Sequence, residues 1–202
     1  KRPMVLCFPE GAWRELLPES KLLCESQEAR SIEEQLRKII YHGEFLRDEN
    51  PIESAYYVPM AIKDSGYGLS PVRKKSDELY GADHFETVIN GMEDIEKMHL
   101  PEISVDWDES RRNLEWFQEL FGDILDVKLS GSCRTGIAPI DAYAELRGID
   151  RIFYDIMDCP EMIHAFCQRY IDAMIHAAKE IERQGALTLH LRNEYAGSGG
   201  NC

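Results

Sequence analysis

Short apolar runs separated by longer amphipathic stretches organise most of this chain. Apolar runs lie at residues 4–8 and 187–191, and two further strand candidates lie at 52–58 and 126–130; each is bounded by proline, glycine or polar residues. A short continuous apolar run between turn residues is typical of a buried strand. We therefore predict four strands, and we expect a loop or a short helix at 10–19, after the first strand.

The stretches between these runs place apolar residues at helical intervals. Ser31 and Glu34 have the spacing of a capping box, which predicts a helix over about 32–46. Four more helices are predicted, from Asp108 to a stop at Gly122, over 138–146, over 151–157, and from Pro160 to Gly185. Helices therefore lie on the connections between most of the strands.

This order of elements predicts an α/β fold with a parallel sheet, since helical crossovers join parallel strands. Residues 59–106 interrupt the order, because they are rich in glycine, serine, proline and charge. We expect an irregular excursion there, with a small strand at 85–89 and one or two helical turns at 94–99. No linker composition divides the chain, so we expect one domain over 1–202.

The charge balance narrows the class of partner. The 202 residues carry a net charge of −14, which argues against nucleic acid and anionic membranes, because both attract clustered Lys and Arg. No apolar run approaches the roughly 18 residues of a membrane span. Six scattered cysteines without a C-x-x-C pair indicate reduced thiols, so we expect a cytoplasmic protein. The chain begins at Lys1 with no charged-then-apolar leader, which fits a start inside a longer protein.

The C-terminal segment carries the most informative candidate residues. The last apolar run ends in polar residues and glycines, and in alternating α/β proteins ligands bind at that end of a buried strand. Asn193 and Glu194 are therefore candidates for binding and chemistry, or they cap the loop through backbone N–H groups. His190 is either a core histidine or a metal candidate. The chain stops with nothing after this loop to close a sheet, so we expect part of a larger enzyme.

Two further places offer candidate substrate-binding residues. Tyr56, together with Tyr57 and Trp13, either lines a pocket or packs under the 59–106 excursion. Arg134 lies in a loop after a predicted strand, where it either binds an anionic substrate group or is simply an exposed arginine. The residues alone leave both alternatives open in each case.

Three pairs of segments, taken in order, resemble the uroporphyrinogen decarboxylase superfamily. They are Arg2-Pro-Met-Val-Leu-Cys-Phe8 with Leu17-Pro-Glu19, Val127-Lys-Leu-Ser-Gly-Ser132 with Asp141-Ala-Tyr-Ala-Glu-Leu-Arg-Gly148, and Asp158-Cys-Pro-Glu-Met-Ile-His164 with Leu189-His-Leu-Arg-Asn-Glu-Tyr-Ala-Gly197. The resemblance implies a TIM-type (β/α)8 barrel, of which this chain supplies about the first half, truncated at both ends. Half a barrel has open edges and exposed apolar faces, so we expect the isolated chain to be inactive and to aggregate or form a homodimer.

The two chemistries of the superfamily give two hypotheses for function. One is cofactor-free decarboxylation of the acetate arms of uroporphyrinogen in tetrapyrrole (heme) synthesis. The other is methyl transfer between a small methylated substrate, a corrinoid protein and a thiol, with the help of zinc. A third hypothesis, from a different class, is a barrel that has lost catalysis and only binds a ligand or partner.

The motifs, matched residue by residue, favour methyl transfer. The family's first loop reads Arg-Gln-Ala-Gly-Arg, but here Glu10 lies where an arginine is lost, and Arg14 alone stands for the second arginine. An acidic residue there is unfavourable for a substrate with many carboxylates. Glu10 and Arg14 are otherwise read as a solvated pair on a short helix. Tyr143 matches a substrate-binding tyrosine, and Glu194 replaces a serine of the last strand motif.

The resemblance therefore implies the following roles. Tyr143 and Glu194 would be catalytic, and Glu10, Arg14, Tyr56, Arg134 and Asn193 would bind substrate. The thiol-activating relatives carry their zinc ligands in the C-terminal half, so within this chain only His190 and Glu194 are metal candidates. The decarboxylase alternative needs no cofactor.

Overall fold

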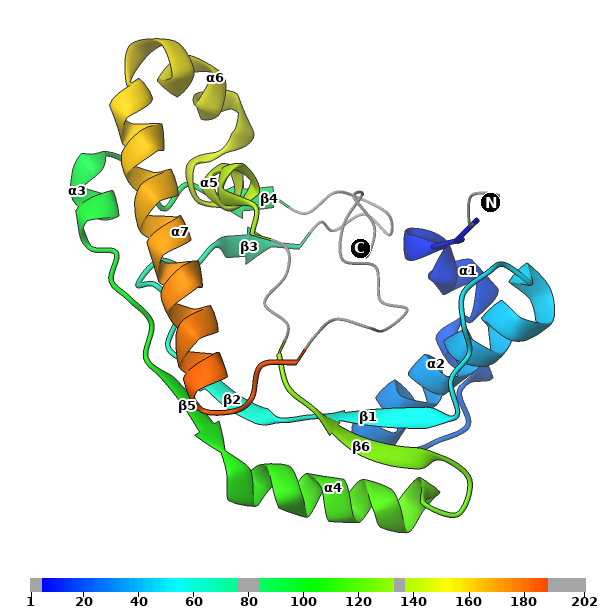
Figure 1. Cartoon of the computed structure of the whole chain (residues 1–202). Coiled ribbons are helices and arrows are strands. Elements are labelled where there is room, and N and C mark those ends of the chain that lie inside the picture. The colour runs from blue at the N-terminus through cyan, green and yellow to red at the C-terminus, as the bar shows by residue number, and fades with distance from the viewer. Residues whose placement is uncertain (1–4, 76–83, 133–136, 189–202) are drawn as a thin grey trace. The chain divides into compact units, whose positions relative to one another are not determined.

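The computed structural model describes residues 5–75, 84–132 and 137–188 (Figure 1). The chain packs as two compact units, one made of residues 1–54 with 191–202 and the other of residues 55–190. Within the described residues, no helix combines the length and the apolar character needed to cross a membrane.

The first unit is helical, and none of its described residues, 5–54, is fully buried. Its elements are the 3-10 turns η1 (Glu10–Ala12) and η2 (Glu19–Lys21), helix α1 (Trp13–Leu16), helix α2 (Gln27–Tyr41) and the π-helical turn η3 (His42–Leu46). The short helix expected over 10–19 is confirmed. Hydrogen bonds between charged side chains and the backbone, together with ring contacts of Trp13, Tyr41 and Phe45, connect the elements of this unit.

Helix α2 begins before the predicted capping box. Ser26 caps the helix, and its side-chain oxygen accepts a hydrogen bond from the Ala29 N–H at 3.2 Å. A capping box would bring the Glu34 carboxylate back to the N–H of Ser31, but Glu34 instead pairs with Lys38 at 2.6 Å. The predicted start is therefore wrong, because a serine nearer the N-terminus already satisfies the first turn.

The strand predicted at 4–8 is wrong for its described residues, 5–8, which form no ladder. The Val5 N–H donates to the Glu49 carboxylate at 2.6 Å, and the Cys7 N–H donates to Asp48 Oδ2 at 2.8 Å. The Val5 carbonyl accepts from the Glu49 N–H at 3.0 Å. The two acidic residues thus take the place of a neighbouring strand, and the Val5 side chain stays 67% exposed.

The second unit contains the predicted parallel pairing. Strand β1 (Ala55–Pro59) runs parallel to β6 (Asp126–Ser130), and Ser132 forms a further parallel bridge with Leu187. These findings confirm strands within the predicted ranges 52–58 and 126–130. Beyond Thr188, the predicted last strand lies outside the described residues.

Gly131 is required where these segments meet. A Cβ atom at this position would lie 1.9 Å from the carbonyl oxygen of Ala186. The Gly131 N–H donates to Thr188 Oγ1 at 2.9 Å, and the Ser132 N–H donates to the same Ala186 carbonyl at 2.9 Å. Only glycine permits so close an approach of two backbones.

Helix α4 (Trp107–Phe121) packs along one face of the parallel pair (Figure 1). Asp106 caps it by accepting a hydrogen bond from the Glu109 N–H at 2.9 Å. The ring of Tyr56 on β1 stacks on Phe117, with ring centroids 4.9 Å apart. The helix predicted from 108 to Gly122 is confirmed, since Gly122 follows its last turn.

The 59–106 excursion contains more regular structure than predicted. Strand β2 (Ala61–Asp64) pairs antiparallel with β5 (Ile103–Asp106), and β3 (Val72–Lys74) pairs antiparallel with β4 (His84–Glu86). Helix α3 (Met92–Glu96) overlaps the helical turns expected at 94–99, and β4 overlaps the expected small strand. Strands β2 and β5 were not predicted, because each is short and mixes apolar with charged residues.

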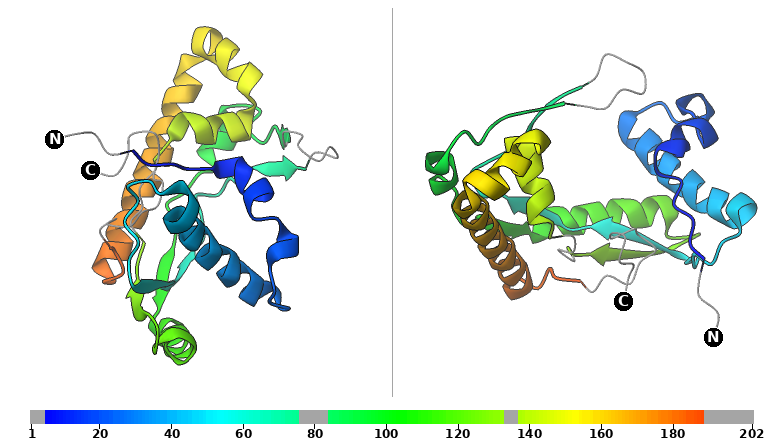
Figure 2. Two further views of the ribbon diagram at one scale, coloured as in Figure 1. Left: turned by 90° about the vertical axis from the view of Figure 1, so that its right-hand side faces the viewer. Right: turned by 90° about the horizontal axis from the view of Figure 1, so that it is seen from above.

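Three helices carry the core of the second unit (Figures 1 and 2). They are α5 (Pro139–Arg147), α6 (Ile149–Asp158) and α7 (Pro160–Arg183), close to the predicted ranges. The buried cluster that they form with α3 and its flanking loops consists of Ile89, Ile95, Met98, Tyr143, Leu146, Ile152, Met162, Ile163 and Phe166. Gly148, with φ of +95°, links α5 to α6, and Gly185, with φ of +74°, follows α7.

The fold is mixed α/β with small sheets. The described residues form three two-stranded sheets, and they do not close a barrel. Parallel pairing is confirmed where helices connect the strands, whereas the excursion uses antiparallel pairs.

Candidate functional site

The most highly connected buried polar group lies between α5 and α6. The Asp155 carboxylate accepts hydrogen bonds from Arg147 Nε and Nη2, both at 2.8 Å, and from the Tyr143 hydroxyl at 2.8 Å. The Asp155 and Arg147 side chains are only 5% and 12% exposed. Tyr143 and Arg147 both reach the Asp155 carboxylate because they lie four residues apart, on one face of α5.

Arg147 also fixes the chain that precedes α3. Its Nη1 donates to the carbonyls of Ile89 and Asn90 at 3.1 and 3.2 Å. The Val88 and Ile89 N–H groups in turn donate to the Leu146 carbonyl at 2.7 and 3.0 Å. The guanidinium therefore joins α5 and α6 to a segment almost 60 residues earlier in the chain.

The electrostatics of this cluster favour fixed charges over proton transfer. Hydrogen bonds from Arg147 hold the pKa of Asp155 below its usual range, although burial acts in the opposite direction. Burial, followed by the hydrogen bond to Asp155, raises the pKa of Tyr143. The tyrosine hydroxyl therefore keeps its proton and donates it to an ionised carboxylate. In this position Tyr143 positions α6; its predicted catalytic role stays a prediction.

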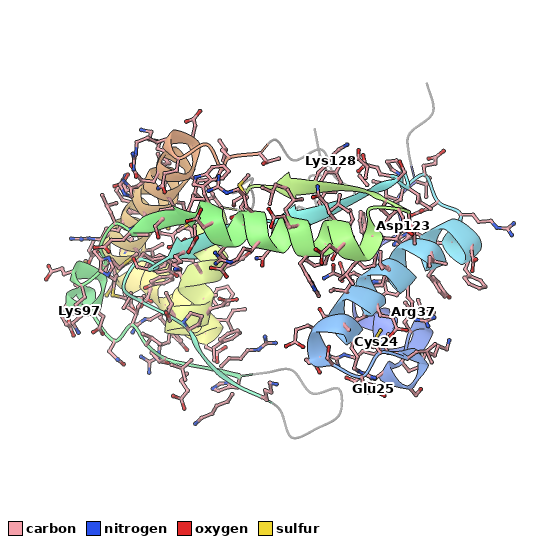
Figure 3. The ribbon with its side chains drawn as sticks, turned by 90° about the horizontal axis from the view of Figure 1, so that it is seen from below. Cys24, Glu25, Arg37, Lys97, Asp123 and Lys128 are labelled. Carbon is pink, nitrogen blue, oxygen red and sulfur yellow. The ribbon has the colours of Figure 1, made fainter. Side chains whose placement is uncertain are left out.

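A second polar region lies on the parallel strands. Tyr56 on β1 packs toward α4, so the strand alternation places Tyr57 and its register partner Lys128 on the opposite face. Lys128, labelled in Figure 3, pairs with Asp126 two residues before it on β6, at 2.5 Å. A buried parallel sheet is usually apolar on both faces, so a lysine and an aspartate on one face mark it as a polar surface. The sequence analysis missed this feature, although the alternation of β6 was visible.

The described substrate-binding candidates lie on elements other than those that carry the Tyr143 cluster. Glu10 and Arg14 are exposed residues of η1 and α1 in the first unit, and Glu10 has a φ of +46°. Tyr56 lies against α4, where burial raises the pKa of its hydroxyl. Its position matches the packing alternative, although the packing partner is α4 and not the excursion.

Four predicted residues lie outside the described residues: Arg134, His190, Asn193 and Glu194. Among the described residues, no group of three or more His, Cys, Asp or Glu side chains is arranged to hold a metal ion. The described part of the chain therefore offers no set of zinc ligands.

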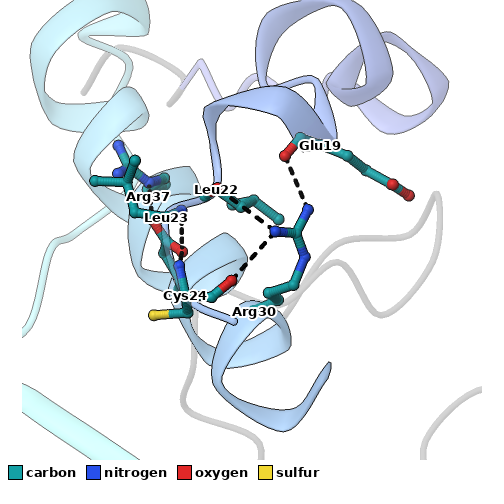
Figure 4. A network of polar contacts seen from close by, with 7 residues as sticks. Glu19, Leu22, Leu23, Cys24, Arg30 and Arg37 are labelled. Atoms are coloured by element: carbon teal, nitrogen blue, oxygen red, sulfur yellow. Dashed lines mark hydrogen bonds and ion pairs between the residues drawn. The ribbon is translucent and has the colours of Figure 1, made fainter. Parts of the chain in front are cut away.

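A polar network in the first unit was also missed by the sequence analysis (Figure 4). Glu33 on α2 accepts hydrogen bonds from the Leu23 and Cys24 N–H groups at 2.8 and 2.9 Å, and from Arg37 Nε at 2.8 Å. The N–H groups of Cys24 and Leu23 are the main reason why the pKa of Glu33 falls to about 2. The carboxylate thus ties the loop before α2 to the helix.

Arg30 completes this network from the same helix. Its guanidinium donates to the carbonyls of Glu19, Leu22 and Cys24 at 2.9, 3.5 and 3.2 Å. Glu33 therefore satisfies backbone donors of the 19–24 segment, and Arg30 satisfies its acceptors. Two charged side chains on one helix thereby fix the conformation of a loop that has no core beneath it.

Each unit also contains a pocket lined by described residues. One, of about 490 Å³, is lined by Glu15, Leu16, Leu17, Lys21, Arg37, Ile40, Tyr41, Glu44 and Phe45 in the first unit. The other, of about 370 Å³, is lined by Lys63, Ser104, Val105, Asp106, Trp107 and Asp108 in the second unit. Both volumes fall in the range of small-molecule sites, but neither pocket is lined by a predicted site residue.

Comparison with known proteins adds no further constraint: no family model, no curated protein and no solved structure matches this chain.

Proposed function

We propose that this chain belongs to an enzyme of the uroporphyrinogen decarboxylase superfamily, built on a TIM-type (β/α)8 barrel. The proposed reaction transfers a methyl group from a small methylated compound to a corrinoid. The observation that carries the proposal is the sequential order of the parallel segments: β1, then β6, then the segment at Leu187.

Sequential order of the parallel segments is what a barrel requires. In a (β/α)8 barrel each strand pairs with the next parallel strand along the chain, whereas a doubly wound sheet reverses its order at a switch point. Here α4 lies on the connection from β1 to β6, and α5 to α7 lie on the connection from β6 to Leu187. This agrees with the order and spacing of the motifs that resemble the family.

Barrel enzymes carry their chemistry at the carboxyl ends of the strands. Arg134 follows β6 along the chain, and His190, Asn193 and Glu194 follow the segment at Leu187. The proposal assigns Arg134 to an anionic group of the substrate and Asn193 to substrate orientation. Both segments already meet at Gly131 and Thr188, which is why residues just beyond them are expected to share a site.

The chemical requirement at such a site is a proton donor. When a methyl group passes from a heteroatom of the donor to the corrinoid, the heteroatom keeps the bonding electrons and takes up a proton. Glu194 is the residue assigned to deliver that proton. This role accounts for the acidic Glu194 at the position where the family motif has serine. The step requires no zinc ligand from the described residues.

The test is methyl transfer to cob(I)alamin by the complete barrel enzyme, since half a barrel alone is expected to be inactive. It is followed by absorbance, with a panel of methyl ethers, methylamines and methyl thioethers as donors. We expect methylcobalamin to form, and we expect Glu194→Gln to slow its formation by about a hundredfold or more, the usual contribution of general acid catalysis. Glu182→Gln, which changes an exposed acid in the last turn of α7, is the matched control. Zinc content is measured on the same samples.

Other outcomes would assign other functions. Decarboxylation of uroporphyrinogen without methyl transfer would replace the proposal by the decarboxylase hypothesis. Ligand binding with neither activity would indicate a non-catalytic barrel. Equal rates for the Glu194 and Glu182 variants would remove Glu194 from the reaction.

A further inference from the structure

Helix α6 buries an aspartate and exposes most of its large apolar side chains. Its buried residues are Ile152 and Asp155, the latter in the ion pair with Arg147. The inward face thus uses an aspartate where a helix on a core normally uses an apolar residue.

The outward face carries a row of large apolar side chains. Ile149, Phe153 and Met157 are spaced four residues apart, and they are 66%, 68% and 80% exposed. Tyr154 and Ile156 flank the row and are 70% and 52% exposed. These five residues are called the α6 apolar face.

The size of this face indicates an interface. With about 150–250 Å² for each aromatic side chain, Phe153 and Tyr154, which are 68% and 70% exposed, alone present on the order of 280 Å² of accessible surface, and the three aliphatic side chains add to this area. The largest apolar patch on a typical monomer is roughly 300–600 Å², and each partner of a standard interface contributes about 800 Å². The α6 apolar face is therefore large enough to be the centre of a specific contact.

The charges around the face identify the kind of partner. Asp150, Asp158 and Glu161 are exposed along α6 and at the start of α7, against a single exposed cation, Arg151. The whole chain carries a charge of −14. A second copy or an anionic membrane would bring negative charge against negative charge, whereas a basic surface would be attracted.

We infer that the α6 apolar face docks a basic amphipathic helix of another protein. Apolar side chains on one stripe of that helix pack against Phe153 and Met157, and its Lys or Arg residues lie beside Asp150 and Asp158. This is a standard mode of helix recognition, with anchors one turn apart. The inference rests on the described geometry of α6 and does not depend on the proposed enzymatic activity.

The test uses the full 202-residue chain and a labelled synthetic peptide of about 14 residues, roughly four helical turns, made of Leu and Lys at amphipathic spacing. Binding is measured by fluorescence anisotropy. We expect the Phe153→Ser/Met157→Ser double variant to weaken binding about tenfold or more, the loss typical of an interface hot spot. The Asp150→Asn/Asp158→Asn double variant should reduce both the affinity and its dependence on salt.

The matched control is Ile124→Ser, which changes an apolar side chain that is 73% exposed just after α4. It should leave binding unchanged. Because all of the substituted residues are exposed, circular dichroism melts should confirm that each variant folds like the parent.

Three results would overturn the inference. The first is equal loss of binding in the Ile124→Ser control and the α6 double variant. The second is equal binding of a Leu and Glu peptide, which would show that charge does not select the partner. The third is self-association of the chain, measured by sedimentation, that the Phe153→Ser/Met157→Ser substitutions abolish, since the occupant would then be a second copy.

Discussion

Arg147 and Asp155 form a two-point ion pair across the junction of α5 and α6, with Nε to Oδ2 and Nη2 to Oδ1 both at 2.8 Å. The planar guanidinium matches the carboxylate at both oxygens, a geometry that lysine cannot reproduce. Both side chains are nearly inaccessible to water. The pair therefore sets the angle at which α6 leaves α5.

Removing one partner of this pair should strongly destabilise the second unit. Arg147→Ala leaves a buried carboxylate without its cation, and we expect a loss of about 3–5 kcal/mol in the free energy of unfolding. Urea denaturation followed by near-UV circular dichroism measures it. Arg151→Ala, on the exposed side of α6, should change stability by no more than about 0.5 kcal/mol. Similar midpoints for the two variants would contradict the structural role of the pair.

The Tyr143 hydroxyl should contribute less, because one hydrogen bond is lost without stranding a charge. Tyr143→Phe keeps the ring against Phe166, whose centroid is 5.1 Å away, and removes the bond to Asp155. We expect about 1.5–3 kcal/mol of destabilisation, the usual value for a hydrogen bond to a charged group. If the variant unfolds at the same urea concentration as the parent, this bond contributes nothing to stability.

The first unit should loosen in acid through Glu33. Its folded pKa of about 2 lies below the ordinary value of 4.5, so its stabilising effect is complete above about pH 4.5 and is lost as the pH falls from there toward 2. The stability difference between the parent and Glu33→Gln should therefore be large at pH 7 and shrink over that interval. Amide exchange of Leu23 and Cys24 by NMR reports it directly.

The control for this titration is Glu34→Gln, on the exposed side of α2. In the Glu34→Gln variant at pH 7, the amides of Leu23 and Cys24 should exchange as slowly as they do in the parent. A constant difference between the parent and Glu33→Gln from pH 7 to pH 2 would disprove the assignment.

Gly131→Ala should break the contact between the end of β6 and the segment at Leu187. The new methyl group would lie 1.9 Å from the Ala186 carbonyl oxygen, and a backbone atom cannot move aside as a side chain can. We expect at least about 3 kcal/mol of destabilisation, the upper range for overpacking. Gly11→Ala, where no atom lies within 4 Å, is the control and should unfold like the parent.

The two serines near the start of α2 should behave differently. Ser26→Ala removes the N-cap and should cost about 1 kcal/mol. Ser31→Ala falls inside the helix, where alanine is the better helix former, so its effect should be neutral or slightly stabilising. Thermal melts of the two variants give the comparison, and equal losses would favour the capping box predicted from sequence.

Strongly periodic segments with clear end signals were predictable from sequence. Helix α4 ends before Gly122 and α7 ends before Gly185, and both glycines mark the ends in the sequence. The strand predicted at 4–8 was wrong because Asp48 and Glu49 bind the backbone of that segment. No local sequence pattern indicates such a partner. Strands β2 and β5 depend on pairing across the excursion, which periodicity does not reveal.

The candidate site was also predictable only in part from the sequence. Tyr143 was predicted as a site residue through a family resemblance. Its partners Arg147 and Asp155, on either side of the α5–α6 junction, were not predicted. One signal was available: Asp155 recurs with Ile152 at helical spacing, where an apolar residue would be expected. The Glu33 network carries no comparable signal, because its acceptor is a carboxylate on a helix and its donors are backbone groups of a loop.

The absence of a fully buried residue in 5–54 has a consequence for how this protein responds to heat. Apolar side chains that are only partly buried expose less new apolar area on unfolding than a core does, so residues 5–54 contribute a smaller share of the heat-capacity increment. The order of these residues comes from ionised carboxylates and guanidinium groups on loop backbone. In a calorimetric scan, the unfolding transitions of the two units should therefore differ. The helical core of 55–190 should supply the enthalpy peak. The first unit should give a shallow transition whose temperature shifts with acid and salt.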